Sequence, residues 1–513
     1  MLAAAAVVAV VYLLGVTNAW WPTPDSALYQ GLGRSLFRGE GYRFNGELHT
    51  TVTPGLPVIL GALHAAFGEG FWAPNLLMAL CGLGGLLLAW RTLIRRTDRR
   101  TAFAAVLATA GLYRYYDYSH LILTDAPFVL LFWLLAYCCA RALEGGWAWL
   151  IAVALAAAAT LVVRAPGLVI LGPWAVAVAL DRPGRAPLRR RLAVAATIAA
   201  AAAVVVVVLV WPGRLTGYAA ASGKGFSVPT RLYYVLVGLT RLPDALTNTL
   251  LAQRSAWLTP VGVALLALAV TGGVALWRRG RRLAAVTCTL NVVGVCFFVG
   301  YRSVRARYMM ALYPLILLLV FEGLFWCVGR LRRWKQRPDR PIVFLQAATV
   351  LTAGLIAVNA PRVLRHAVYF AYRGHTGRYH EVIEHGKYAE LRPLAEFLRE
   401  RFGSDATIAV RPDRVSMLHF LGSVRAVPFK KVCVWNPWSA AHAEEIYADL
   451  RARPGLRAIV FDRGEMDKRF VRRMRELLDG AGDLERIHSG KLCSVYQRST
   501  PGPASGPASR RSP

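Results

Sequence analysis

Long apolar stretches recur through the first 360 residues, and they restrict the fold more than any other feature of the chain. A run of about 18 to 25 mostly apolar residues is long enough to cross the hydrocarbon core of a bilayer as a helix. We expect about eleven such spans, near residues 2–20, 71–91, 101–119, 126–143, 147–164, 167–180, 192–211, 257–277, 283–300, 308–328 and 341–360. The chain is therefore predicted to be a polytopic α-helical membrane protein.

The composition agrees with a membrane location and argues against a nucleic-acid partner. Hydrophobic residues make up 56% of the chain and charged residues only 18%, whereas about a quarter of the residues in soluble domains are charged. The formal net charge is +32, a value that suggests nucleic-acid binding in a soluble protein. Most of the basic residues, however, form short clusters between apolar blocks, which is typical of membrane anchoring at the cytoplasmic face.

The positions of these basic clusters predict the orientation of the spans. Arginine is concentrated in four loops that fall on one side when the spans are counted: Arg91–Arg100, Asp181–Arg191, Trp277–Arg282 and Arg330–Arg340. Lysine and arginine favour the cytoplasmic side of short loops. We therefore expect a cytoplasmic N-terminus, with the loop 21–70 and everything after about residue 360 outside the cytoplasm. A signal peptide is the alternative for residues 2–20, but the segment has no basic region ahead of it, and a retained span is expected.

The pattern changes after residue 360 from apolar blocks to alternating short elements. Amphipathic stretches at Leu391–Phe402 and Ala440–Arg453 are separated by short apolar runs such as Thr407–Val410 and Arg457–Phe461. This alternation indicates a soluble α/β domain. We divide the chain into a membrane domain at 1–360, an extracytoplasmic α/β domain at 361–498 and a disordered tail at 499–513.

Cysteine use points to no metal site. Six of the eight cysteines lie within apolar spans, where they behave as small hydrophobic residues, and no CxxC pattern occurs. Cys433 and Cys493 both fall after residue 360. They are expected either to pair in an oxidising compartment or to remain two separate thiols.

The first candidate site cluster follows the first span. Asp25 is followed by the amphipathic run Ser26–Arg38, and Tyr29 lies one turn further along the same helix face. A carboxylate at the membrane surface beside an aromatic ring is suited to act as a base on a hydroxyl or amine. The alternative is that Asp25 only caps the helix.

The second cluster precedes the fourth predicted span. The run Tyr113–His120 contains four tyrosines, which we interpret mainly as an interfacial aromatic belt. Asp125 follows, with Pro127 in the first turn of the span, so that it serves either as a helix cap or as a second acid of one site.

The third cluster lies between the ninth and tenth spans, on the side where basic residues are not favoured. It contains Arg302, Arg305, Arg307 and Tyr308, and Arg164 lies in another turn on the same predicted side. The guanidinium group forms paired hydrogen bonds with phosphate oxygens. These residues are therefore expected to bind a lipid phosphate, and the alternative is general anchoring to lipid head groups.

These motifs, taken in order, resemble those of the GT-C superfamily, in particular protein O-mannosyltransferases and lipid A aminoarabinose transferases. The resemblance rests on Asp25-xxx-Tyr29, Gly39-x-Gly41-Tyr42, Pro54-x-Leu56-Pro57, Leu123-Thr124-Asp125-Ala126-Pro127, and Arg307-Tyr308 followed by Pro314. It covers residues 1 to about 360 in layout, and a C-terminal α/β domain occurs in a common family variant. The chain departs from the family pattern at Ser26, where a second acid is frequent, and at Gly55, where a second proline is frequent.

The resemblance implies a membrane glycosyltransferase with an inverting mechanism. The donor would be a polyprenyl-phosphate-linked sugar, and the acceptor a hydroxyl or amine on a glycan, lipid or protein. Asp25 would be the base, Asp125 would assist binding of the acceptor or sugar, and Arg302, Arg305 and Arg307 would stabilise the leaving phosphate. No obligatory metal is expected, because arginine neutralises the phosphate.

Two other functional classes fit part of the pattern. A transporter or flippase of lipid-linked glycans also has many spans and arginines on the outer side, but internal repeats are common in transporters and none is visible here. A scaffold that binds a partner through its C-terminal domain has no need for two acids on one side of the membrane.

Overall fold

The computed structural model describes residues 1–18, 20–164, 167–180, 186–210, 227–252, 256–298, 306–334, 340–375, 390–404, 406–411, 415–422, 424–429, 440–453, 455–462, 468–490 and 493–498. Two compact units divide the chain. The helical unit comprises Met1–Ala19 and His49–Gly377, and the sheet unit comprises Trp20–Leu48 and Arg378–Pro513. The segment Trp20–Leu48 therefore groups with residues that follow it by more than 300 positions.

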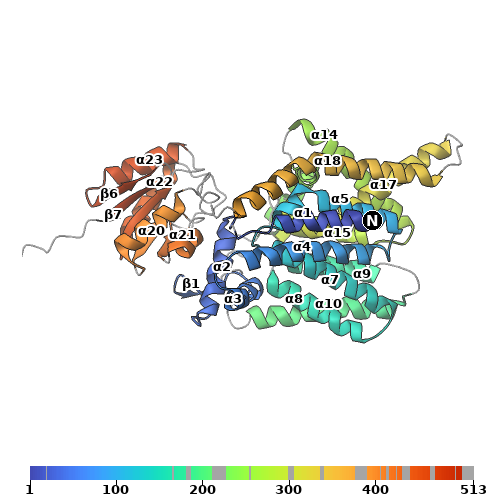
Figure 1. Ribbon diagram of the computed structural model, residues 1–513, viewed down its shortest axis with the longest axis horizontal. Helices are drawn as coiled ribbons and strands as arrows, with labels where there is room; N and C mark the ends of the chain where they lie inside the picture. Colours follow the sequence, from blue (N-terminus) through green and yellow to red (C-terminus); the bar gives the residue numbers. More distant parts are fainter. Residues whose placement is uncertain are drawn as a thin grey trace, which may run out of the picture. The chain divides into compact units, whose positions relative to one another are not determined.

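The helical unit consists almost entirely of α-helices, most of which run roughly parallel or antiparallel to one another (Figure 1). In chain order they are α1 (Leu2–Leu14), α3 (Gly55–Phe67), α4 (Trp72–Leu93), α5 (Arg99–Gly111), α6 (Tyr113–Tyr118), α7 (Asp125–Glu144), α8 (Ala148–Val163), α9 (Leu168–Leu180), α10 (Leu188–Val210), α12 (Val228–Thr240), α13 (Leu242–Leu250), α14 (Thr259–Arg278), α15 (Leu283–Phe298), α16 (Ala306–Met309), α17 (Tyr313–Trp334) and α18 (Arg340–His375). Two short 3₁₀ helices, η2 (Ala256–Leu258) and η4 (Met310–Leu312), precede α14 and α17.

Six stretches among the described residues are long and apolar enough to cross a membrane: Trp72–Leu93, Asp125–Glu144, Leu188–Val208, Thr259–Arg278, Arg307–Arg330 and Gln346–Tyr369. Five more apolar helices are shorter: Leu2–Leu14, Gly55–Phe67, Ala148–Val163, Leu168–Leu180 and Leu283–Phe297. Every predicted span contains a helix, but the count of about eleven membrane crossings stays a prediction.

The predicted span at 101–119 is not one continuous helix. Leu112 has an extended backbone (φ −70, ψ 123) that separates α5 from α6. The side chain of Asn359, in α18, accepts a hydrogen bond from the Tyr113 amide at 3.0 Å and donates to the Leu250 carbonyl at 2.7 Å. A buried break in a helix leaves backbone groups that need partners, and this amide supplies one of them.

Glycine allows the closest approach between two helices of this unit. A Cβ atom at Gly272, in α14, would lie 1.8 Å from the Leu319 carbonyl oxygen of α17, and one at Gly323 would lie 1.9 Å from the Leu268 oxygen. Close contact of this kind through small residues is typical of helix pairs in membranes. The buried core of the helical unit includes the rings of Phe132, Trp133 and Trp174.

The sheet unit contains α2 (Pro24–Phe37), a hairpin of β1 (Arg43–Phe44) and β2 (Glu47–Leu48), and a five-stranded sheet. The strands are β3 (Thr407–Val410), β4 (Arg425–Pro428), β5 (Leu456–Asp462), β6 (Leu484–Ser489) and β7 (Cys493–Arg498), in the order β4-β3-β5-β7-β6. β3 is parallel to β4 and β5, whereas β7 is antiparallel to β5 and β6.

Four helices pack on this sheet: α20 (Leu391–Phe402), α21 (Val415–Gly422), α22 (Ala440–Ala452) and α23 (Lys468–Asp479). α22 and α23 lie on one face, with α20 and α21 on the other (Figure 1). The alternation of side chains along a strand explains this arrangement. Ile459 and Phe461 of β5 pack with Ile446 and Met474 in a core on the α22–α23 face.

The first-loop segment is attached to the sheet unit by specific contacts. The side-chain amide of Asn45 donates to the Ala426 carbonyl at 2.6 Å, and its oxygen accepts from the Ala426 amide at 3.1 Å. Arg34 stacks over the ring of Phe420 at 4.3 Å, and the ring of Trp20 lies 4.8 Å from the same ring. α2, which carries Asp25 and Tyr29, is therefore held by the helix α21.

Candidate active site

The most distinctive site in the helical unit is a buried carboxylate held by two arginines. Asp125 is the first residue of α7, and its side chain is 0% exposed. Its two oxygens accept from different residues: Oδ1 from Arg164 Nη1, and Oδ2 from Arg307 Nε at 2.8 Å. A buried carboxylate is stable when it is paired and hydrogen-bonded, and Asp125 meets both conditions.

The helix cap at this position is not Asp125. The N-cap of α7 is Thr124, whose side chain makes no capping hydrogen bond, while the Asp125 side chain turns to the arginines. The capping interpretation is therefore wrong for Asp125, because a charge pair replaces the local backbone contact.

Arg164 comes to the site from the C-terminal end of α8. It is the C-cap residue of that helix, and its guanidinium carbon lies 5.5 Å from the ring centroid of Phe128 and 5.0 Å from that of Tyr308. Stacking on aromatic faces favours a guanidinium that has left bulk water. The side chain is 8% exposed and is therefore fixed between Asp125 and two rings.

Gly55 determines how closely α3 approaches the end of α8. A Cβ atom at this position would lie 2.6 Å from the Val162 carbonyl oxygen. Val162 precedes Arg164 by two residues, so glycine here permits the packing that places the arginine. This contact gives a physical reason for glycine where the resembled family often has proline.

Arg307 and Tyr308 lie on the short helix α16. The Arg307 side chain is 27% exposed, in contrast to the fully buried carboxylate that it contacts. The following turn, η4, is anchored by a hydrogen bond from Trp133 Nε1 to the Ala311 carbonyl at 3.0 Å. α7 therefore contributes both the acid and the tryptophan that anchors the segment carrying its partner.

A second layer of polar residues, from α6 and α13, borders this site. Arg114 donates to Asn248 Oδ1 at 3.2 Å and lies 3.9 Å from Asp117 Oδ2.

Asp117 and Asn248 were not predicted from the sequence as residues near the site. The Tyr113–His120 run is interpreted from the sequence mainly as an aromatic belt. The signal that was available is an acid and an arginine three residues apart within that run, since Arg114 and Asp117 have helical i, i+3 spacing. Asn248, 134 residues from Arg114, has no local signal.

Asp25 and Tyr29 belong to the sheet unit. Asp25 is half-buried in the first turn of α2, and Tyr29 is 7% exposed on the same helix. The N-cap is Thr23, so the interpretation of Asp25 as the capping residue is wrong. A negatively charged side chain in the first turn stabilises a helix through its interaction with the helix dipole.

Ser26 has a structural role that accounts for the missing second acid. Its hydroxyl accepts from the Thr23 amide at 3.0 Å, and its amide donates to the Thr23 hydroxyl at 3.0 Å, which completes a capping box. Trp20 Nε1 also donates to the Ser26 hydroxyl at 3.0 Å. Ser26 is fully buried, so this position serves the start of α2.

The other sequence-predicted residues form two groups: those that meet in the structure and those that lie outside the described residues. The structure brings Asp125, Arg164, Arg307 and Tyr308 into one site. Arg302, Arg305 and Cys433 lie outside the described residues. Within the part of the chain that is described, no group of three or more His, Cys, Asp or Glu side chains is arranged to hold a metal ion.

Comparison with known proteins finds a family model and several solved structures that are similar to this chain. A family model for dolichyl-phosphate-mannose-protein mannosyltransferases matches residues 51–211. ArnT from Cupriavidus metallidurans bound to undecaprenyl phosphate is similar in structure, with a TM-score of 0.50 and 16% sequence identity over 96% of this chain and 97% of that chain. No curated protein sequence matches the chain.

Two archaeal structures are also similar. The apo form of the Archaeoglobus fulgidus oligosaccharyltransferase has a TM-score of 0.56 and 12% identity over 90% of this chain and 69% of that chain. The oligosaccharyltransferase AglB from the same organism, in complex with an inhibitory peptide and a dolichol-phosphate, has a TM-score of 0.52 and 11% identity over the same shares.

The fold is therefore that of the GT-C membrane glycosyltransferases, the superfamily that the sequence motifs resemble. Residues 51–211, which include Asp125 and Arg164, carry the match to the mannosyltransferase family model within that superfamily.

Proposed function

We propose that the chain is an integral-membrane glycosyltransferase that uses a polyprenyl-phosphate-linked sugar as donor. The acceptor is a hydroxyl or amine of a glycan, lipid or protein. The main support is the buried carboxylate of Asp125 between Arg164 and Arg307, at the start of a candidate span in a GT-C fold. Lipid phosphates are bound in the structures of ArnT and AglB, which share this fold.

In this proposal Arg307 binds the phosphate of the donor. Its side chain is partly exposed, whereas that of Arg164 is almost entirely buried. A guanidinium fixed in position before the reaction stabilises negative charge that develops on a leaving phosphate. Arg302 and Arg305 are proposed to assist, since they precede Arg307 by five and two residues.

Asp125 acts through the arginines it holds. Both of its oxygens already accept from guanidinium groups, so it is poorly placed to take a proton from an acceptor. It is therefore a positioning residue. Its charge holds Arg164 and Arg307 in position to bind a lipid phosphate. The ring of Tyr308 packs against the guanidinium group of Arg164.

Asp25 is proposed as the general base. The acceptor oxygen or nitrogen attacks the anomeric carbon, and its proton passes to the Asp25 carboxylate. The bond from the anomeric carbon to the phosphate oxygen breaks, and the electron pair leaves with the lipid phosphate. A single displacement of this kind inverts the anomeric configuration. Tyr29, one turn further along α2, is proposed to contact the substrate.

The proposal places this chemistry on the extracytoplasmic face. The four arginine-rich loops are proposed to lie in the cytoplasm, and the sheet unit is proposed to be an extracytoplasmic α/β domain. Membrane lipids, the lipid-linked donor and the acceptor are the proposed partners, and no obligatory metal is required by this mechanism.

The test is transfer of a labelled sugar by the purified protein. Incubation with a panel of radiolabelled polyprenyl-phosphate sugars should give a product whose formation is lost in Asp25→Asn. Glu47→Gln is the matched control, because Glu47 belongs to the same unit and its side chain is 77% exposed. Movement of an unchanged lipid-linked sugar across vesicles, without transfer in any reaction of the panel, would replace this proposal with the transporter alternative.

A further inference from the structure

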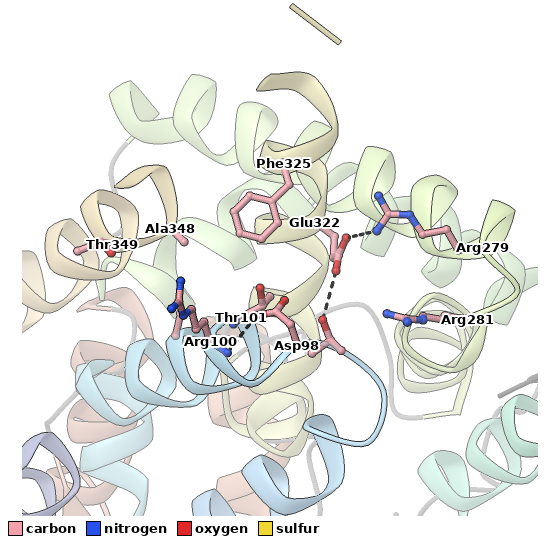
Figure 2. A pocket seen from close by; sticks show the side chains of 11 residues that line it. Asp98, Arg100, Thr101, Arg279, Arg281, Glu322, Phe325, Ala348 and Thr349 are labelled. Carbon is pink, nitrogen blue, oxygen red and sulfur yellow. Dashed lines mark hydrogen bonds and ion pairs between the residues drawn. The ribbon is translucent and has the colours of Figure 1, made fainter. Parts of the chain in front are cut away.

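A pocket lies in the helical unit among α5, α14, α17 and α18, away from Asp125. Its volume is about 690 Å³. Figure 2 shows the polar residues Asp98, Thr101, Arg279, Arg281 and Glu322 around it. The apolar part of the lining comes from Ala104, Phe325 and Ala348. Within this pocket, Glu322 lies well inside α17. It is nine residues, or about 14 Å along the helix axis, beyond Tyr313, the first residue of α17.

Both acids of the pocket are satisfied within the protein. Asp98 is the N-cap of α5 and accepts from the amides of Arg100 at 3.0 Å and Thr101 at 2.9 Å. Glu322 is 4% exposed and accepts from Arg279 Nη1 at 2.9 Å and from the Thr97 hydroxyl at 3.4 Å. Neither carboxylate needs an added cation.

Three arginines line the pocket, and only the guanidinium of Arg279 is paired with an acid. Arg100 and Arg281 are exposed to solvent. Among the residues that the structure describes, the guanidinium groups of Arg100 and Arg281 have no hydrogen-bond or ion-pair partner. Arg281 extends into the pocket from the loop after α14 (Figure 2). Two carboxylates and three guanidiniums give the lining a formal charge of +1.

We propose that this pocket binds the phosphate group of an anionic ligand, as a second site separate from Asp125. Arg100 and Arg281 supply the charge-assisted hydrogen bonds, and Glu322 holds Arg279 at the edge. The apolar wall formed by Phe325 and its neighbours lies beside these groups, which suits a phosphate attached to a hydrophobic chain. The same chemistry is offered by a lipid head group and by a soluble phosphate ester.

Two probes distinguish these sources. Dioctanoyl phosphatidic acid and glycerol 3-phosphate both carry a phosphomonoester, and only the first has acyl chains. Binding to the full-length protein in an uncharged detergent is measured by native mass spectrometry. Binding of phosphatidic acid alone assigns the pocket to a lipid head group, and equal binding of both probes assigns it to a soluble phosphate.

The variants test the site itself. The titrations use an Arg307→Gln background, so that the phosphate site proposed above contributes little, and they are repeated in the wild-type chain. Arg100→Gln with Arg281→Gln should weaken binding by at least about tenfold. Arg189→Gln is the matched control, because Arg189 is an exposed arginine of α10 outside the pocket and should not change the affinity.

Glu322→Gln separates an anion site from a cation site. Removal of a negative charge from the lining should strengthen phosphate binding, whereas a cation site would be weakened. The proposal is overturned if neither probe binds, if Arg189→Gln weakens binding as much as the pocket variants do, or if only Arg307→Gln abolishes it. The last outcome would leave the proposed glycosyltransferase site intact.

Discussion

Asp125 shows how a single residue determines the chemistry of the site. An ionised carboxylate in an apolar interior is costly unless charge partners and hydrogen bonds replace water. Arg164 and Arg307 take the place of water at the two oxygens of Asp125. The two arginines come from helices that are distant in the sequence. Removal of the acid therefore leaves two guanidiniums without their counter-charge.

Asp125→Asn is expected to cost about 3–5 kcal/mol of stability, because the change breaks a buried charge pair. Transfer activity should fall by about 10²–10³-fold, since the phosphate-binding arginine loses its fixed position. Thermal unfolding and initial rates measure the two effects. A double variant with Arg164→Gln should lose less stability than the sum of the single variants, and strict additivity would contradict the pairing.

At the scale of elements, close packing decides where the functional side chains lie. α3 and α8 approach through Gly55, and α14 and α17 approach through Gly272 and Gly323. In the sheet unit, the hairpin β1–β2 turns at Asn45, which has a φ of 60, and Gly46, which has a φ of 81. Such a left-handed pair is typical of a two-residue hairpin turn.

Gly55→Ala tests the link between helix packing and the site. The new methyl group would meet the Val162 carbonyl, so α3 or the end of α8 must shift and Arg164 moves with it. We expect transfer to fall by about 10- to 100-fold while the protein remains folded, because small displacements of a binding group are costly in rate. Gly354→Ala in α18 is the control, since no heavy atom lies within 4 Å of its added Cβ, and equal losses would contradict this role.

His419 predicts a pH-dependent attachment of the first-loop hairpin. Its Nε2 accepts from the Asn45 amide at 3.2 Å while Nδ1 lies 3.0 Å from the Val424 carbonyl, so the ring is bound in its neutral form. Burial lowers the pKa of His419 below its usual value of about 6.5. The contribution of neutral His419 to the stability of the hairpin's attachment is therefore complete above about pH 6.5. It is lost as the pH falls through the lowered pKa of His419.

Amide hydrogen exchange at Asn45, corrected for the intrinsic effect of pH, should show reduced protection below about pH 6. His419→Gln removes the titrating group and should flatten this dependence. Protection that changes equally in the variant would exclude His419 as the cause.

At the scale of the whole molecule, the proposed activity depends on which side of the membrane each loop occupies. Basic residues predict that the segments containing Arg189 and Arg279 face the cytoplasm. The first loop and the residues after α18 are expected on the opposite side. The phosphate pocket, which includes Arg279, then faces the cytoplasm.

Cysteine labelling in intact cells tests this orientation. Glu47→Cys should react with a membrane-impermeant maleimide, and Arg189→Cys should react only after permeabilisation. The unsubstituted chain is the control for its own eight cysteines. Labelling of both positions from the same side would remove the topological basis of the proposed mechanism.

Much of the architecture was predictable because helix formation in a bilayer is a local requirement. Apolar length alone indicates the spans, since every backbone polar group must be satisfied within its own helix. The helix Leu391–Phe402 and the strand Thr407–Val410 also lie where their local patterns predicted them. The acids and arginines of the site were recognisable as charges in places where charge is unfavourable.

What the tertiary structure decided is which of these residues meet. Asp125 contacts arginines that are 39 and 182 positions away, and no local pattern specifies such a pairing. The attachment of Trp20–Leu48 to the sheet unit and the break at Leu112 likewise depend on Asn45, His419 and Asn359 finding distant backbone groups. The sequence by itself determined the helices and the kinds of charge, whereas packing over long separations determined the partners of each charge.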